Sequence, residues 1–179
     1  MKINKDKIKD FKIFNNINND GIELFLNKMQ LKSYQENEII MHEGDKGNSI
    51  LLLLNGEISI TKALTLPTNK KNDTLNKAEL LINDNREKEI IRCNAENNII
   101  IGEISLFSKK NERTATVKAL TNCNIAYLEK DDFFEICNQN TEIGYKAINN
   151  LTQIITQRLI DTNHQVLKLT TAFSLIVDN

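Results

Sequence analysis

The sequence has few residues of the kinds that bind metals or form disulfides. Its 179 residues include three cysteines, Cys93, Cys123 and Cys137, without a C-x-x-C pair, and two histidines, His42 and His164. So few sulfur and imidazole ligands, so widely spaced, argue against a structural zinc site, and we expect no metal cofactor. The odd cysteine count indicates an intracellular, cytoplasmic protein in which Cys123 and Cys137, set among apolar neighbours, are small core residues.

The sequence also has no excess of charge of one sign and no long apolar run. It contains 23 Lys and Arg against 24 Asp and Glu, mixed along the chain, for a formal net charge of −1. Proteins that bind the phosphate backbone of nucleic acids carry a basic surface, so we expect no direct nucleic-acid partner. The apolar run Ile50–Leu54 is far too short to cross a bilayer, and the charged start MKINKDKIKD is unlike a signal peptide. We therefore expect no membrane partner.

What the sequence does contain is a candidate anion site between residues 101 and 117, which read IGEISLFSKKNERTATV. Gly102 permits unusual backbone angles and the close approach of a ligand. A helical turn after it would direct free N–H groups and a positive dipole end at an anion. The Glu103 carboxylate can accept hydrogen bonds from sugar hydroxyls, and the Arg113 guanidinium can hold phosphate oxygens through two parallel N–H bonds. On spacing alone, a surface ion pair between Glu103 and Arg113 explains the same residues.

The same stretch resembles the phosphate-binding cassette of cyclic-nucleotide-binding domains, the family of the bacterial catabolite activator protein and of the regulatory subunits of cyclic-nucleotide-dependent kinases. The eleven-residue step from Gly102 to Arg113, with Glu112 before the arginine, is closer to the bacterial form than to the shorter kinase cassettes. Gly44-Asp45 and Gly56 fall where the family carries turn glycines, so the resemblance extends over nearly the whole chain. It implies a mainly β fold with flanking helices, an antiparallel β-roll that holds the cassette in its mouth.

The resemblance also implies roles for individual residues. Gly102 would contact the cyclic phosphate or the ribose through its backbone, Glu103 would accept the ribose 2′-OH, and Arg113 would pair with the exocyclic phosphate oxygens. Ser105 departs from the alanine or glycine common at its position, but it is small enough to be tolerated. The remaining ligand-binding residues expected in the cassette are Ile104 and Thr114.

The chain is expected to divide into three parts. Residues 1–30 carry a helical pattern with a break at Asp20-Gly21, and we interpret them as a helical lid on the body. Residues 31–130 read as many short strands with turns between them, which is typical of an antiparallel barrel or sandwich and here predicts the β-roll. Residues 131–179 begin with Asp131-Asp132 as the cap of a short helix and continue as a long helix.

Two loops stand out within the predicted β-roll. The apolar segments Ile50–Leu54 and Glu57–Thr61 flank Asn55-Gly56, which favours positive φ, and predict a β-hairpin with this pair at its tip. Residues 63–88 form a polar stretch with the only proline of the chain, between two strand patterns. We interpret them as an insertion in a hairpin loop, either a solvated connector or a partner-binding segment.

The long helix predicted over residues 143–176 carries a seam with alternating spacings of four and three. The seam residues are Ile148, Thr152, Ile155, Leu159, Thr162, Val166, Leu169 and Phe173. This is the a/d pattern of a coiled coil, on a helix that would be roughly 50 Å long. It predicts a homodimer formed with the same helix of a second chain. The alternative is a helix folded back on its own β-roll.

Thr162 and Asn163 are the residues that bear on the choice of base. A hydroxyl in an apolar seam needs a hydrogen-bond partner, and the resemblance places this pair where a Thr-Ser pair contacts the adenine amino group, one of them across the dimer. The Asn163 carbonyl can replace the serine as an acceptor. Thr162 could instead bond back to the Arg158 carbonyl. Thr114 resembles the threonine of cyclic-GMP-binding kinases and channels, but the bacterial spacing leads us to predict cyclic AMP over cyclic GMP.

Taken together, these features predict a cyclic-AMP sensor that acts as a ligand-controlled switch on an unidentified downstream protein. We expect no enzyme, because neither histidine has a Ser or Cys nucleophile beside it in a recognisable motif. The alternatives are a transcription regulator of the activator family truncated before its DNA-binding domain, a cyclic-GMP sensor, and a ligand-free module that dimerises through its helix.

Overall fold

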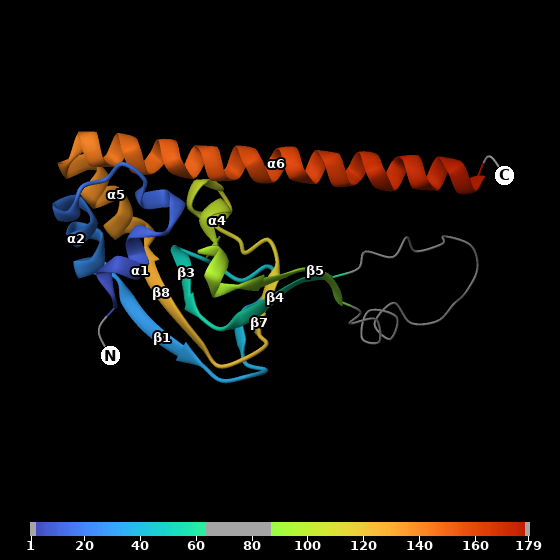
Figure 1. Ribbon diagram of the computed structural model, residues 1–179, viewed down its shortest axis with the longest axis horizontal. Helices are drawn as coiled ribbons and strands as arrows, with labels where there is room; N and C mark the ends of the chain where they lie inside the picture. Colours follow the sequence, from blue (N-terminus) through green and yellow to red (C-terminus); the bar gives the residue numbers. More distant parts are fainter. Residues whose placement is uncertain (1–2, 64–86, 178–179) are drawn as a thin grey trace. The chain divides into compact units, whose positions relative to one another are not determined.

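The computed structural model describes residues 3–63 and 87–177. These residues form two compact units, which we treat separately. The β unit comprises the described residues of 29–130, and the helical unit comprises 3–28 together with 131–177 (Figure 1).

The described strands of the β unit form two antiparallel four-stranded sheets. The first sheet has the order β1-β8-β3-β6, with strands Gln30–Tyr34 (β1), Cys123–Glu129 (β8), Ser49–Asn55 (β3) and Ile100–Ile101 (β6). The second has the order β2-β7-β4-β5, with strands Ile39–Met41 (β2), Thr116–Ala119 (β7), Glu57–Ala63 (β4) and Glu87–Asn94 (β5). Both sheets contribute to one core, whose fully buried members include Leu51, Leu53, Ile58, Val117 and Ile125. This arrangement confirms the predicted antiparallel β-roll.

The predicted hairpin at Asn55-Gly56 is wrong. β3 pairs with β6 and β8, whereas β4 pairs with β5 and β7, so the chain passes from one sheet to the other at Gly56. Gly56 has φ 93°, and a Cβ added there would lie 2.6 Å from the carbonyl oxygen of Asn122. The Asn-Gly pair correctly marks a positive-φ turn, but turn composition does not reveal whether the flanking strands share a sheet.

The insertion predicted over residues 63–88 lies largely outside the described residues, which resume at Glu87. The strands on either side of it pair along their full length, from Glu57 opposite Asn94 to Ala63 opposite Glu87. The segment therefore connects two adjacent antiparallel strands, as a hairpin loop does.

The N-terminal part of the helical unit consists of three short helices: Lys5–Lys9 (α1), the 3-10 turn Lys12–Phe14 (η1) and Asn19–Lys28 (α2). The expected break at Asp20-Gly21 is wrong, because both residues lie inside α2. The break falls earlier, where Asn16 has φ 61° and the Asn18 side chain accepts a hydrogen bond from the Gly21 N–H at 2.9 Å. Asparagine tolerates positive φ and caps helices, so the Asn-rich segment ends one helix and starts the next.

The C-terminal part consists of Lys130–Gln139 (α5) and the 37-residue helix Thr141–Val177 (α6). Asp131 and Asp132 lie in the first turn of α5 rather than before it, where they still complement the helix dipole. The rings of Phe25 and Phe133 lie 5.9 Å apart between centroids, which joins α2 to α5.

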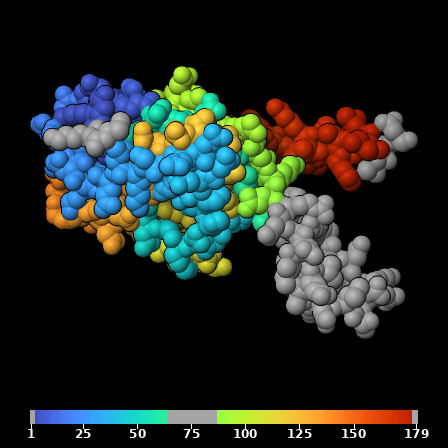
Figure 2. Space-filling model, turned by 90° about the horizontal axis from the view of Figure 1, so that it is seen from below, coloured from blue at the N-terminus to red at the C-terminus, as the bar shows by residue number. Residues whose placement is uncertain are grey.

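The 3-10 turn η1 packs against α6, near the orange start of that helix in Figure 1. Figure 2 shows blue N-terminal residues and orange residues of this unit on the same side of the view. The α6 residues buried there recur at helical spacing: Gly144, Ala147, Asn150 and Leu151. The Asn150 amide donates hydrogen bonds to the carbonyls of Ile13 at 3.0 Å and Asn15 at 2.8 Å. These two bonds fasten the end of η1 to α6.

The exposed part of the predicted seam lies farther along α6 than these buried residues. Of the seam residues, Leu159, Val166, Leu169 and Phe173 are 56 to 70% exposed in the single chain. The long helix is confirmed, and the apolar residues of its seam from Leu159 onward are exposed in the single chain. Within the described residues, none of the helices combines the length and apolar character needed to span a bilayer.

Candidate functional site

Residues 101–117, called the cassette from here on, connect β6 to β7 in the β unit. Gly102 follows β6 with φ 79° and is the N-cap of a one-turn helix, Glu103–Phe107 (α4). Positive φ at this position favours glycine, since a side chain would be strained there. The chain then turns through Asn111, which has φ 50°, and reaches Arg113 three residues before β7.

The backbone around Arg113 is hydrogen-bonded to the turn between β2 and β3. The Gly44 N–H donates to the Arg113 carbonyl, the Arg113 N–H donates to the Asp45 carbonyl, and the Gly47 N–H donates to the Asn111 carbonyl, each at 2.8 Å. Three such bonds over a few residues fix the direction in which the Arg113 side chain leaves the backbone.

Arg113 is 7% exposed, and its side chain contacts the first part of the cassette and the start of β3. Its Nη1 donates to the Ser49 carbonyl at 2.9 Å, to the Ser105 hydroxyl at 3.1 Å and to the Gly102 carbonyl at 3.4 Å. Its Nη2 donates to the Ser49 hydroxyl at 3.0 Å. The structure therefore brings together Gly102, Ser105 and Arg113, as predicted.

Ser49 is a direct contact of Arg113 that the sequence analysis missed. It precedes the apolar run of β3 and is 5% exposed, so its hydroxyl is buried against Arg113. A polar residue at the head of an otherwise apolar strand was the available signal, but nothing in the local pattern links it to an arginine 64 positions later.

Two glycines make room for the guanidinium. A Cβ added at Gly47 would lie 2.1 Å from Arg113 Nε, and one added at Gly102 would lie 2.3 Å from Nη1. Both distances are far below van der Waals contact, so any side chain at either position would displace the arginine. Gly47 was predicted only as part of a turn, and its packing against Arg113 is a finding of the structure.

Burial lowers the pKa of Arg113 from its ordinary value, because the charged form loses hydration. Tyr127 and the carboxylates of Glu129, Glu103 and Asp45 act in the opposite direction. An arginine remains protonated at neutral pH under such influences. The cassette thus holds a recessed, permanently charged cation.

The other predicted cassette residues differ in exposure. Glu103 is 2% exposed, at the first position of α4, and Ser105 is 1% exposed, with its hydroxyl donating to the Gly102 carbonyl at 2.7 Å. Ile104 is 46% exposed, and Thr114 is also exposed beside Arg113 in the chain. The carboxylate and the serine therefore belong to the buried interior of the site, while Ile104 and Thr114 are accessible.

Thr162 and Asn163 lie on α6, in the helical unit, and both are exposed. The Thr162 hydroxyl donates to the Arg158 carbonyl at 2.8 Å, which is the back-bond considered as an alternative. A hydroxyl that donates this bond can still accept one, so the back-bond and a contact with an adenine amino group are compatible. The base contact stays a prediction.

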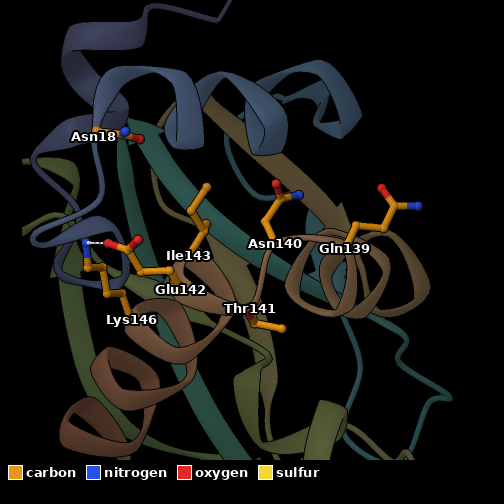
Figure 3. Close-up of a pocket in the computed structure, with 7 residues that line it drawn as sticks. All are labelled: Asn18, Gln139, Asn140, Thr141, Glu142, Ile143 and Lys146. Carbon is orange, nitrogen blue, oxygen red and sulfur yellow. Dashed lines mark hydrogen bonds and ion pairs between the residues drawn. The ribbon is translucent and has the colours of Figure 1, made fainter.

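The helical unit contains a separate hollow of about 330 Å³ (Figure 3). Its lining residues are Asn18, Gln139, Asn140, Thr141, Glu142, Ile143 and Lys146. The single cation, Lys146, is paired with Glu142 at 2.6 Å, and no arginine lines the hollow. It offers no group comparable with Arg113 for an anion. In the described part of the chain, no group of three or more His, Cys, Asp or Glu side chains could hold a metal ion.

Comparison with known proteins connects this geometry to a family. The chain is 24% identical over 145 residues to the cAMP-activated global transcriptional regulator CRP of Salmonella typhimurium, covering 81% of this chain. The match spans 58% of that relative, so this chain corresponds to little more than half of its length.

Solved structures share the fold at low sequence identity. A cyclic nucleotide-binding domain from Methylobacillus flagellatus superposes with a TM-score of 0.69 at 23% identity, covering 90% of this chain and 79% of that one. The c-di-GMP responsive global regulator CLP of Xanthomonas campestris gives a TM-score of 0.65 at 17% identity, covering 86% of this chain and 65% of that one. A family model described as "Cyclic nucleotide-binding domain" matches residues 31–140, which include all of both described sheets except Gln30, together with the cassette and Arg113. The chain belongs to the cyclic nucleotide-binding domain family.

Proposed function

We propose that this chain is a sensor that binds cyclic AMP at the cassette and acts as a ligand-controlled switch on a partner protein. The observation that carries the proposal is the environment of Arg113. Among the described residues its direct hydrogen-bond acceptors are neutral oxygens, from Ser49, Ser105 and Gly102. Burial removes water from the charged guanidinium, which lowers its pKa, and an anionic ligand would offset that cost.

A 3′,5′-cyclic phosphate suits this site because it carries one negative charge and two exocyclic oxygens. The planar guanidinium can present two parallel N–H groups to those oxygens. The low dielectric of the buried setting strengthens the attraction relative to an exposed arginine. Glu103, at the start of α4, would accept the ribose 2′-OH, and the Gly102 backbone would approach the phosphate or ribose closely because it has no side chain.

The choice of cyclic AMP rests on Thr162 and Asn163. In the proposed complex, the Thr162 hydroxyl keeps its bond to the Arg158 carbonyl and accepts a bond from the adenine amino group. The name of the Salmonella relative, a cAMP-activated regulator, supports the same choice. Cyclic GMP is the second candidate, because Thr114 leaves an accessible hydroxyl next to the cassette arginine.

The exposed seam of α6 supports a homodimer as the assembly in which the switch operates. Its apolar residues beyond Arg158 are accessible in the single chain, and burial against a second α6 would remove them from water. Ligand binding can shift the relative stability of two conformations by no more than its difference in affinity for them. The output is either a separate protein or a DNA-binding segment of a longer regulator, since the curated relatives are transcriptional regulators and extend well beyond the matched region.

Calorimetric titration of the chain with cyclic AMP, cyclic GMP and cyclic di-GMP tests the ligand. We expect the tightest binding for cyclic AMP. Binding of none of the three would favour a ligand-free interaction module, and preference for cyclic GMP would transfer the base contact to Thr114.

The base contact itself is tested with Thr162→Ala. Loss of the acceptor should weaken cyclic AMP binding more than cyclic GMP binding, because only adenine presents an amino group at that position of its ring. Thr156→Ala, at another exposed threonine of α6, is the control and should change neither affinity. Equal affinities for both ligands before and after Thr162→Ala would remove Thr162 from the site.

A further inference from the structure

The C-terminal half of α6, residues 159–177, is more apolar than a coiled-coil dimer requires. Its large apolar side chains are 43 to 75% exposed: Leu159, Ile160, Val166, Leu167, Leu169, Phe173, Leu175 and Ile176. Over the same residues the only charged side chains are Asp161 and Lys168. An exposed apolar surface of this extent marks an interaction site.

The dimer seam uses only part of that surface. Leu159 and Val166 are at the a position of the heptad, and Leu169 is at d. Ile160 and Leu167 follow the a residues directly, at position b, roughly 100° around the helix. In a two-stranded coiled coil the b position points to solvent. Ile160 and Leu167, 43% and 65% exposed in the single chain, would therefore stay exposed in the proposed dimer.

We propose that the C-terminal halves of α6 from two dimers overlap in antiparallel orientation and form a four-helix bundle, giving a closed tetramer. A helix whose apolar surface is wider than the a/d seam is typical of four-helix bundles, where each helix contacts two neighbours, rather than of two-stranded coils. The occupant of the Ile160 and Leu167 surface is thus a second dimer of the same chain.

The two charges of this segment favour an antiparallel overlap. Asp161 and Lys168 are one heptad apart on the same row, with opposite signs. If two helices run antiparallel with their midpoint near residue 164, Asp161 of one lies near Lys168 of the other, and the reciprocal pair forms as well. The same overlap brings Ile160 of one chain close to Leu167 of the other. Asp161 accepts a bond from the Gln157 amide at 3.0 Å on its own helix, which leaves further lone pairs available.

Symmetry explains why the assembly would stop at four chains. The dimer two-fold axis runs along the helices, and the axis of an antiparallel overlap is perpendicular to it. When the two axes intersect, the assembly closes as a dimer of dimers. The N-terminal half of α6 is packed against η1 through Asn150, so on that face it is not available for the same contact. The exposed C-terminal half is the part that can overlap.

The test is the mass of the full chain, measured by sedimentation equilibrium over a wide range of concentration. We expect four chains at high concentration and two on dilution. The variant Ile160→Gln with Leu167→Gln should stop at two chains while α6 stays helical, since glutamine is a good helix former. The matched control, Leu159→Gln with Val166→Gln, places the same change one residue earlier and should lose the dimer as well.

Two results would overturn the tetramer: a wild-type mass that never exceeds two chains, or a mass of four chains in the Ile160 and Leu167 variant.

Reversing one charge, by Asp161→Lys or Lys168→Asp, should shift the tetramer to higher concentration, and both together should restore it. Failure of the double reversal to restore it overturns the antiparallel arrangement. The inference assumes the seam dimer of the proposed function. Cyclic AMP titration of the Ile160 and Leu167 variant distinguishes a failure of the tetramer from a failure of nucleotide binding. Retained nucleotide binding with a lost tetramer is the expected outcome.

Discussion

Arg113 combines deep burial with direct contacts to neutral oxygens, and this combination makes it sensitive to small changes nearby. Arg113 donates hydrogen bonds to three parts of the chain: the first residue of β3, the N-cap of α4 and the first turn of α4. Three of the contacts hold Nη1 and one holds Nη2, so the orientation of the guanidinium is set before a ligand arrives. Such pre-organisation reduces the entropy that binding has to overcome.

Replacing Arg113 with leucine should weaken cyclic nucleotide binding by about 2–5 kcal/mol, the usual cost of removing one partner of a buried charge pair. Calorimetry measures the effect, with circular dichroism to verify the fold. Arg92→Leu is the matched control, because Arg92 is an exposed arginine of the same unit, paired with Glu89 at 2.7 Å. Equal affinities for wild type and Arg113→Leu, with both folded, would show that the phosphate is recognised elsewhere.

Replacing Ser49 with alanine should weaken binding by about 1 kcal/mol, the typical net value of one hydrogen bond. The change removes the hydroxyl that accepts from Nη2 but keeps the carbonyl that accepts from Nη1. The guanidinium would lose the hydrogen bond that holds Nη2 and keep its charge. Ser33→Ala, whose hydroxyl bonds Asn124 on the exposed side of β1, should leave the affinity unchanged. A loss as large as that of Arg113→Leu would instead indicate that Ser49→Ala disturbs the fold.

At the residue scale, the sequence was sufficient for the cassette and insufficient for its surroundings. Gly102, Glu103, Ser105 and Arg113 lie within a dozen positions, so one short stretch of sequence carries the resemblance to the family motif. Ser49 reaches Arg113 only through the pairing of strands, and such pairing depends on contacts that are distant in the chain.

At the scale of elements, Gly56 decides how two strands are joined. The chain leaves the first sheet through β3 and enters the second through β4. The glycine between them has positive φ, and a Cβ added to it would collide with the Asn122 carbonyl oxygen. Local propensity predicted both strands and the turn, but pairing is a tertiary property. The apolar run of β3 is buried almost throughout, because this strand lies between β6 and β8.

Gly56→Ala should lower the free energy of unfolding by roughly 1–3 kcal/mol for the backbone strain, plus a further loss for the contact with Asn122. Urea denaturation measures this. Gly44→Ala is the matched control, since Gly44 has a similar φ of 86° but nothing within 4 Å of an added Cβ. The Gly44 variant should therefore show the strain alone. Equal losses in the two variants would mean that the Asn122 contact relaxes without cost.

At the scale of the whole molecule, the long helix carries the proposed assembly. Its length and its heptad spacing could both be predicted from the sequence, because they depend on periodicity alone. The packing of its first half against the N-terminal segment could not be predicted, because the Asn150 hydrogen bonds link residues more than 130 positions apart.

Changing Leu159 and Val166 to glutamate should convert the protein to a monomer, because like charges would meet in a dry seam. Sedimentation velocity at micromolar concentration measures the change. Glutamate at Gln157 and Gln165, which lie outside the seam, is the control for added charge alone and should weaken association far less. A monomeric wild-type protein would refute the dimer and favour a helix folded on its own β-roll.

The pairing of β4 with β5 has a practical consequence for protein engineering. Ala63 and Glu87 are opposite partners in an antiparallel ladder, so their Cα atoms are held about 5 Å apart. Whatever sequence joins them needs only to have ends that meet at that distance. A two-residue turn, or a reporter protein whose termini are adjacent, could therefore replace the native connection while the ladder stays in register. This graft point would allow the domain to be developed into an optical biosensor.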